Sequence, residues 1–496
     1  MHSTLEKILA RHNWISTFTH PPDIASLLRT NDAPSPPQSI QLKTSLEGLK
    51  GPLAELESDL DLLRNAVVSL ETQMSRLQSF KRDCETVLSP IRRIPLEITI
   101  EIVRRSWKNS LSGFHVFIIP EGPWHLGQVC SSWRNVIEKH CPELWATMGV
   151  TELSYNGEEA KKSDMVEILR IVLERSRNHP LNFRFRHYST MVKEGKPDYM
   201  EKCFDIMVAH SKRWREVELT IPPSFFPRLS LVRGKIDWLA DMDLRVSCSG
   251  NPQSGDIGAF EVAPKLEKLY LSHLHPEASI HFPVTNLVAF SDVRAFAGDK
   301  LTPEYLSVVK SAPKLRSFSY NDYNDYSIHN QMSTPPSFPC VMSRSLIGLS
   351  ASSPSFLRSM ELPSLKEFML TTTYGINRGE AVIKCPVGAL GALHEMLLKS
   401  QCPLTQLHLI DAVLDNNLAN IIRLIPSLQE FVVEFYEWVN NYDPIMQSLV
   451  TQLSEVSLVN GPSQHCMVPN LQNLVLIYLI TITLASLLSI PHLSTW

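Results

Sequence analysis

The sequence predicts a multidomain protein that is all-α in its N-terminal part and α/β in the remainder. Three observations indicate this fold class. Apolar residues at alternating three- and four-residue spacing predict a long helix over residues 42–88, and two helical motifs predict a small all-α domain over residues 89–148. A strand pattern then recurs along residues 149–496, which predicts an irregular α/β solenoid. At 496 residues, the chain exceeds what one hydrophobic core usually organises.

Residues 1–41 are expected to form a short helical start followed by a linker. The segment from Asn31 to Ser39 is rich in proline and serine and should be extended. The first residues include Glu6, Lys7 and Arg11, where a signal peptide would need an unbroken apolar stretch. We therefore expect a cytosolic or nuclear protein.

The apolar run over residues 42–88 has the 3.5-residue repeat of a coiled coil. Its members are Leu42, Leu46, Leu49, Leu53, Leu56, Leu60, Leu63, Val67, Leu70, Met74 and Leu77. Gly48, Gly51 and Pro52 interrupt its first part, and an internal proline removes a helix hydrogen bond, so the helix is expected from about Pro52 onward. The run predicts either dimerisation of two copies or a helix that folds back on its own chain. Too few complementary charges flank the run to decide between them.

The next region begins with a helix that has two apolar stripes. Pro95 suits its first turn, because the N–H that proline lacks would be unpaired there. One stripe contains Leu96, Ile100, Val103 and Trp107, and a nearly opposite stripe contains Ile94, Ile98 and Ile102. One small core cannot bury both stripes, so this helix needs a partner surface.

A second motif follows at helical spacing and ends before Pro142. The residues at this spacing are Leu126, Val129, Cys130, Trp133, Val136, Ile137 and His140. With the residues around these motifs, the stretch from Ser89 to Met148 is expected to form three helices.

Three fragments of these motifs, in this order, resemble the F-box family. They are Ile94-Pro95-Leu96-Glu97-Ile98, Leu126-x-x-Val129-Cys130-x-x-Trp133-Arg134 and Cys141-Pro142-Glu143-Leu144-Trp145. The resemblance implies a small domain that binds a Skp-type adaptor, which links it to the cullin and the RING protein of an SCF-type ubiquitin ligase. The residues that match adaptor-facing positions of the family are Pro95, Leu96, Ile98, Ile102, Val129, Cys130 and Trp133.

The sequence departs from the family pattern in two places. Ile94 replaces the leucine that opens the family motif, and the connection from Lys108 to Trp124 is long and apolar. That insertion could cover part of the adaptor-binding face. The alternative interpretation is a plain three-helix bundle, in which the coiled-coil helix and the following domain bury both stripes.

Helix-like and strand-like segments alternate through the rest of the chain, and one pattern recurs: an apolar residue, proline, then Leu-x-x-Leu/Phe-x-apolar. The first leucines of its copies are Leu266, Leu315, Leu365, Leu404, Leu428 and Leu471. The pattern resembles an irregular leucine-rich-repeat array, which implies a curved sheet that binds a target protein. Because copies between Leu271 and Leu362 are degenerate, another α/β arrangement with accidental spacing is the alternative.

Near the C-terminus, Leu474 to Ile490 is almost continuously apolar. One interpretation is a membrane anchor, but a spanning helix needs about 20 apolar residues, usually with basic or aromatic borders. The run lies between two copies of the repeat, the second of which begins at Ile490. We therefore expect one strand and one buried helix here, and regard a membrane as an improbable partner.

The sequence contains no recognised catalytic or metal-binding motif. Without a phosphate-binding glycine loop, a nucleophile elbow or a clustered set of His and Cys residues, we expect no cofactor, no metal and no intrinsic catalysis. The nine cysteines are scattered without a C-x-x-C pair and should be reduced, mostly buried thiols. A net charge of −4 argues against nucleic acid as the principal partner.

The sequence thus predicts a non-catalytic receptor subunit of a ubiquitin ligase, whose helical domain binds the adaptor and whose repeats bind an unidentified target. Two alternatives belong to other classes. One is a coiled-coil and repeat scaffold that acts outside a ubiquitin ligase. The other is an enzyme with an unrecognised site.

Overall fold

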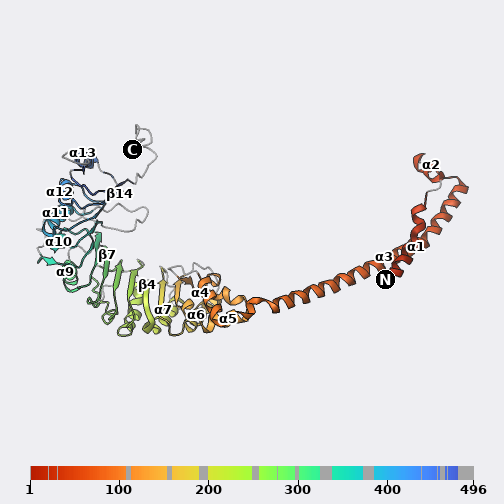
Figure 1. Cartoon of the computed structure of the whole chain (residues 1–496), viewed down its shortest axis with the longest axis horizontal. Helices are drawn as coiled ribbons and strands as arrows, with labels where there is room; N and C mark the ends of the chain where they lie inside the picture. The colour runs from red at the N-terminus through yellow and green to blue at the C-terminus, as the bar shows by residue number, and fades with distance from the viewer. Residues whose placement is uncertain are drawn as a thin grey trace. The chain divides into compact units, whose positions relative to one another are not determined.

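The computed structural model divides the chain into two compact units, Met1–Pro95 and Leu96–Trp496. The first unit is all-α and the second is mixed α/β (Figure 1). The residues described are 2–19, 22–30, 32–107, 113–152, 159–188, 199–247, 256–275, 277–295, 301–323, 338–371, 385–436, 438, 440–454, 456–457, 464–465 and 467–478.

A single long helix dominates the N-terminal unit. α3 has 53 residues, none of which is buried. The described elements of this unit are α1 His2–His12, η1 Asn13–Thr17, α2 Pro22–Thr30, α3 Pro36–Leu88 and η2 Pro90–Arg93, where η denotes a 3₁₀ helix. The long N-terminal helix that the sequence predicts is therefore confirmed.

α3 begins earlier than the sequence predicts, because a capping box starts it at Pro36. The Ser35 backbone N–H donates to Gln38 Oε1 at 3.0 Å, and proline in the first turn leaves no N–H unpaired. The helix also continues through Pro52, which costs one hydrogen bond. The predictions of an extended segment through Ser39 and of a start near Pro52 are therefore wrong.

One large parallel sheet organises the second unit. Its thirteen described strands are hydrogen-bonded in chain order, and each pairs in parallel with the next, so β1 and β17 are the first and last strands of the described sheet. The strands are β1 Phe114–His115, β2 Thr147–Thr151, β3 Leu181–Arg186, β4 Trp214–Ile221, β5 Asp241–Val246, β6 Lys268–Ser272, β7 Ala289–Ala295, β8 Ser317–Tyr323, β10 Gly348–Ala351, β12 Glu367–Leu370, β13 Gln406–Ile410, β14 Glu430–Phe435 and β17 Asn473–Tyr478.

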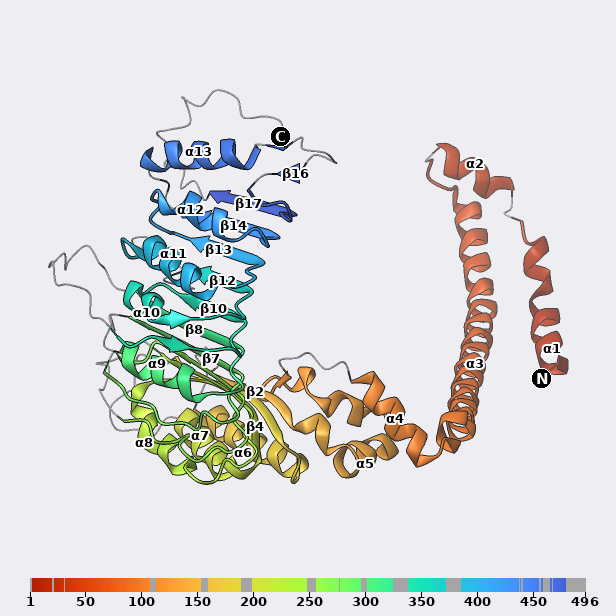
Figure 2. The same cartoon turned by 60° about the vertical axis from the view of Figure 1, so that its left-hand side comes forward.

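Many connections between strands contain a helix, and Figure 2 shows α9 to α12 along one face of the sheet. The α-helices of this unit are α4 Leu96–Ser106, α5 Ser131–Lys139, α6 Glu159–Arg175, α7 Tyr199–Ala209, α8 Phe226–Leu229, α9 Thr302–Ser311, α10 Pro354–Arg358, α11 Ala389–Ser400, α12 Asn417–Leu424 and α13 Asp443–Ser454. Its 3₁₀ helices are η3 Ile119–Glu121, η4 Pro123–Gln128, η5 Pro142–Trp145, η6 Ser211–Arg213, η7 Pro223–Phe225, η8 Ser230–Val232 and η10 Asn440–Tyr442. Two small sheets pair β9 Val341–Met342 with β11 Met360–Glu361, and β15 Val456–Ser457 with β16 Gln464–His465.

Two rows of inward-facing side chains cross the strands and form the core. Because side chains alternate along a strand, the rows lie two residues apart. The first row is in register from β2 to β14 and fully buried: Met148, Phe183, Val217, Met242, Leu269, Phe290, Phe318, Leu349, Phe368, Leu407 and Phe431. The six copies of the sequence pattern form β6, β8, β12, β13, β14 and β17, so the strand pattern is confirmed.

Two strands of the array, β7 and β10, do not match the sequence pattern well. In β7, Phe290 occupies the first row, but Asp292 occupies the second. In β10, Leu349 occupies the first row and the small Ala351 the second. These polar and small residues explain why the copies between Leu271 and Leu362 look degenerate in the sequence.

The stretch from Ser89 to Met148 differs from the three helices expected. Its described residues contain two α-helices, α4 and α5, with several 3₁₀ helices around them. The described part of the insertion forms β1, in which Phe114 pairs with Met148 of β2. Gly113 enables this pairing, since its φ is +69° and a Cβ would lie 2.5 Å from the Thr147 carbonyl oxygen. The helical motifs are thus continuous with the sheet.

The C-terminal apolar run begins as a strand. β17 covers Asn473–Tyr478 and pairs with β14, as the repeat interpretation expects. The rest of the run, including the helix expected after it and the copy that begins at Ile490, lies outside the described residues.

A buried ion pair replaces apolar packing at β7. Arg294 Nε donates to Asp292 Oδ2 at 2.9 Å, and both side chains are almost completely buried. The Tyr305 hydroxyl of α9 also donates to Asp292, while Arg294 donates to the carbonyl oxygens of His275 and Ala278. The cluster therefore connects β7 to α9 and to the 275–278 loop.

We predict that Arg294→Met strongly destabilises the second unit, because it leaves the Asp292 carboxylate buried without a cation. The free energy of unfolding should fall by about 3–5 kcal/mol. The matched control is Arg358→Met, which removes an exposed ion pair with Glu395 and should cost less than about 1 kcal/mol. Urea denaturation followed by circular dichroism measures both, and equal small losses would contradict the role given to the buried pair.

Candidate functional site

α4 presents one apolar side to the core and another to solvent. On the inner side, Val103 is buried, and Ile100 and Trp107 pack against the core. On the opposite side, Ile98 is 53% exposed, and Leu96 is also exposed although it belongs to the first turn of the inner stripe. Ile94 and Ile102 of the second stripe are half-buried, so the exposure of that stripe is concentrated at Ile98.

The residues directly before α5 also include exposed side chains. Val129 is 57% exposed and Cys130 is also exposed, whereas Val136 and Ile137 of α5 are buried. α5 packs against α4. We call Leu96, Ile98, Val129 and Cys130 the α4/α5 surface.

The other three residues that match adaptor-facing positions of the family have different exposures. Ile102 and Trp133 are half-buried, and Trp133 packs against the core. Pro95, the last residue of the N-terminal unit, is exposed. A substitution of Trp133 would therefore disturb packing as well as any contact with a partner.

Side-chain contacts hold α4 and α5 on the first strands of the sheet. Arg104 Nε of α4 donates to Glu143 Oε1 of η5 at 2.7 Å, and this hydrogen bond raises the pKa of Arg104. The Trp145 indole donates to the Ile137 carbonyl oxygen at 3.2 Å, so α5 is attached to the turn that leads into β2. The Trp124 ring meets the Trp145 ring edge-on at 4.7 Å, and the Arg175 guanidinium of α6 lies over both.

The described part of the insertion does not bury the α4/α5 surface. Phe114 and Val116 are buried instead in the core. Ile98 and Val129 stay more than half exposed. The coverage that the sequence suggested is therefore not seen at these two residues.

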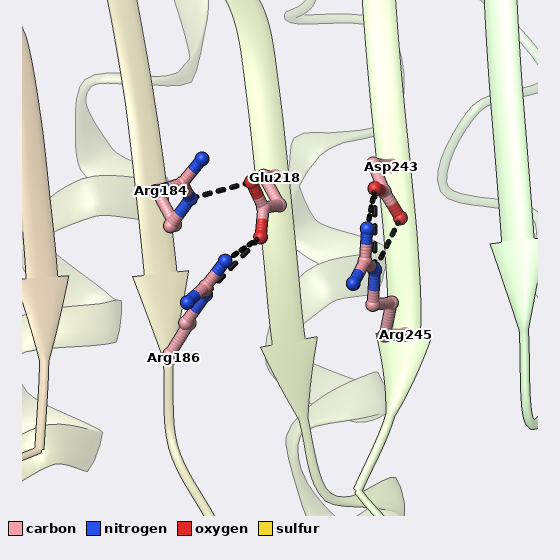
Figure 3. Close-up of polar contacts among 5 residues, drawn as sticks. All are labelled: Arg184, Arg186, Glu218, Asp243 and Arg245. Carbon is pink, nitrogen blue, oxygen red and sulfur yellow. Dashed lines mark hydrogen bonds and ion pairs between the residues drawn. The ribbon is translucent and has the colours of Figure 1, made fainter. Parts of the chain in front are cut away.

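A second candidate surface lies on the outward face of β3, β4 and β5 (Figure 3). Glu218 accepts hydrogen bonds from Arg184 Nε at 2.5 Å and from Arg186 Nη2 at 2.6 Å. On the next strand, Arg245 Nη2 donates to Asp243 Oδ2 at 2.6 Å. We call these five residues the outward ladder.

Charge pairing determines the protonation of the outward ladder. Burial alone would raise the pKa of Glu218, but the hydrogen bonds from Arg186 and Arg184 outweigh it and lower that pKa. The hydrogen bond to Asp243 raises the pKa of Arg245. Glu218 and Arg245 are therefore charged at neutral pH.

The outward ladder follows from strand register. Arg184 is aligned with Glu218, Glu218 with Asp243, and Asp243 with Tyr270. In the row nearer the strand starts, Glu216 and Asp241 add acidic groups, and Lys268 pairs with Asp241 at 3.2 Å. Among the described residues, Nη1 of Arg184, Arg186 and Arg245 has no hydrogen-bond partner.

The outward ladder is not among the sites expected from the sequence, although the sequence contains a signal for it. Arg184 and Arg186 alternate with apolar residues in β3, and Glu216 and Glu218 do so in β4. Alternation of this kind marks a strand with one solvated face. The side chains can be matched only after the register of neighbouring strands is known.

Comparison of the sequence with protein-family models and with curated proteins found no match. In the part of the chain that the structure describes, no helix has the length and apolar character needed to cross a bilayer. The same residues contain no group of three or more His, Cys, Asp or Glu side chains that could hold a metal ion. The two candidate surfaces are thus defined by geometry and sequence pattern.

We predict that Cys130 is alkylated much faster than Cys141 in the folded chain. Burial, with the nearby Glu143 charge, raises the pKa of Cys141 to about 11, so roughly a thousandth of this thiol is ionised at pH 8. Cys130 is exposed on the α4/α5 surface. Mass spectrometry after timed alkylation measures both rates, with the urea-unfolded chain as the control in which they converge. Equal rates in the folded chain would contradict the placement of α5.

Proposed function

We propose that this protein is an F-box subunit that recruits substrates to an SCF-type ubiquitin ligase. In this proposal the α4/α5 surface binds a Skp-type adaptor, and a leucine-rich-repeat-type solenoid binds the target on its outward face. The subunit itself supplies no catalytic group. It accelerates transfer by holding the target close to the charged conjugating enzyme.

The observation that carries the proposal is the outer side of α4. Apolar side chains lose free energy by leaving water, yet Leu96 and Ile98 stay exposed while Val103 on the same helix is buried. Val129 adds a third exposed apolar residue next to α5. Exposed apolar surface on a helix pair whose three sequence fragments resemble the F-box supports adaptor binding there.

The outward ladder supports target binding on the sheet. Three guanidinium groups there retain N–H donors, and Tyr270 is aligned beside them. Acidic and basic groups in adjacent rows favour a polar protein segment with charges of both signs. No small-molecule chemistry is needed to explain such a surface.

A scaffold that acts outside a ubiquitin ligase is the second candidate, and α3 favours it. A helix of 53 residues with no buried residue is typical of assembly proteins. The two candidates differ in one respect, because only the first requires a Skp-type adaptor.

We predict that the full chain binds a purified Skp-type adaptor and that Ile98→Asp and Val129→Asp each weaken binding at least about 30-fold. A charge at the centre of an apolar contact costs about 2 kcal/mol or more. The matched control is Leu231→Asp in η8, whose leucine is 57% exposed. Isothermal titration calorimetry measures the three affinities, and thermal melts verify that each variant is folded.

Two results contradict this proposal. Absence of binding by the wild-type chain removes adaptor binding and leaves the scaffold candidate. An equal loss from Leu231→Asp shows that the α4/α5 surface is not the contact.

We further predict that adaptor binding and target binding use different surfaces, so that target binding can be lost while adaptor binding is kept. Simultaneous Arg184→Ala, Arg186→Ala and Arg245→Ala should abolish target recovery while adaptor affinity stays within about twofold, because well-separated sites act additively. The control replaces Arg170, Arg233 and Arg358, three exposed arginines away from the outward ladder. Quantitative affinity purification compares both triple variants with Ile98→Asp, and unchanged target recovery would contradict binding at the outward ladder.

A further inference from the structure

The second half of α3 carries an apolar seam that no described residue buries. We call Val67, Leu70, Met74 and Leu77 the α3 seam. All four side chains are more than half exposed. Their three- and four-residue spacing places them in one row with the 3.5-residue repeat that two packed helices share.

α1 is bound to one flank of α3 near the middle of the helix. Arg11 Nη1 and His12 Nε2 lie 3.1 and 2.9 Å from Asp59 Oδ2, and Ile8 of α1 is buried. Asp59 directly precedes the apolar Leu60 and so lies on one flank of the row. The opposite flank, which is open, consists of the residues that directly follow Leu63 and Leu70.

Those following residues are Arg64 and Glu71, which are both exposed and opposite in charge. Arg64 bonds Asp61 of its own helix at 3.1 Å, but both side chains are exposed, and such a pair contributes little. When two helices pack antiparallel, residues of this flank meet the same flank of the partner helix. A second copy of this chain therefore offers Arg64 a carboxylate and Glu71 a guanidinium.

We propose that two copies of this chain pair antiparallel through the second halves of their α3 helices, with Val67 facing Leu70 of the second copy. In this register Leu60 faces Leu77 of the second copy, and Leu63 faces Met74. Six consecutive apolar layers then form between residues 60 and 77. Arg64 meets Glu71 of the second copy twice, once on each side of the two-fold axis.

Three other registers are less favourable. A shift of one heptad in one direction places Arg64 against Arg64 of the second copy, and a shift in the other direction places Glu71 against Glu71. A shift of two heptads in one direction brings Lys81 against Leu70 of the second copy. These like-charge and charge-to-apolar contacts weaken the three alternatives. A shift of two heptads in the other direction pairs Arg64 with Glu57, and the charge reversals below distinguish that register, because exchanging Arg64 and Glu71 cannot restore it.

The same residues disfavour parallel pairing. It would place Lys81 against Lys81 of the second copy inside the apolar row. It would also direct Arg64 to Asp59 of the second copy, which Arg11 and His12 already occupy. The antiparallel pairing does not depend on the proposed function, since every residue involved lies in the N-terminal unit.

The first experiment measures self-association of the full chain by sedimentation equilibrium. Leu70→Asp removes two apolar layers and should raise the dimer dissociation constant at least about 100-fold. The control is Leu62→Asp, since Leu62 is 54% exposed and Leu70 is 51% exposed, but Leu62 lies off the α3 seam. A wild-type chain that stays monomeric, or equal effects of the two variants, would overturn the proposal.

The second experiment determines orientation by reversing charges. Arg64→Glu and Glu71→Arg should each weaken the dimer roughly tenfold, because two opposite-charge contacts become like-charge contacts. The double variant should restore wild-type affinity, while Arg76→Glu off the seam should change nothing. In a parallel dimer Glu71 faces Ala66, so a dimer in which the double variant does not recover affinity overturns the antiparallel register.

Discussion

In-register stacking of one apolar residue per strand is the constraint on which the second unit depends. Phe290 is buried because Leu269 and Phe318 occupy the same row on the neighbouring strands. No strand of the array can bury its own residue of this row, so each strand depends on its neighbouring strands to bury that residue. The same alternation that turns Phe183 inward turns Arg184 outward, and the core register thereby also builds the outward ladder.

The helical motifs are part of this array rather than a module beside it. β1 and β2 extend the sheet, and Trp145, the last residue of η5 before β2, is buried and donates to α5. This attachment buries the inner side of α4. What remains is the outer side with Ile98, which is the part of the helix that a partner can contact.

Local patterns made much of this structure predictable. The long helix, the six recurring strands and the two stripes of α4 all come from spacing within one segment.

Three features could not be derived in this way. The capping at Ser35 outweighed the breaks at Gly51 and Pro52, so α3 starts earlier than its interior suggests. The partners of the Asp292–Arg294 pair come from α9 and a distant loop, so the sequence around β7 does not identify them. An isolated aspartate in a strand pattern instead suggests that the strand is interrupted. The outward ladder requires the register of neighbouring strands, which a single segment does not contain.

We propose that α4 and α5 form the contact with a Skp-type adaptor. Hydrogen–deuterium exchange of the full chain, alone and with the purified adaptor, tests this contact. Exchange in residues 96–106 and 129–139 should slow on adding the adaptor, while exchange in β3 to β6 stays unchanged. Unchanged exchange in α4 and α5 at saturating adaptor, or protection confined to the sheet, would contradict it.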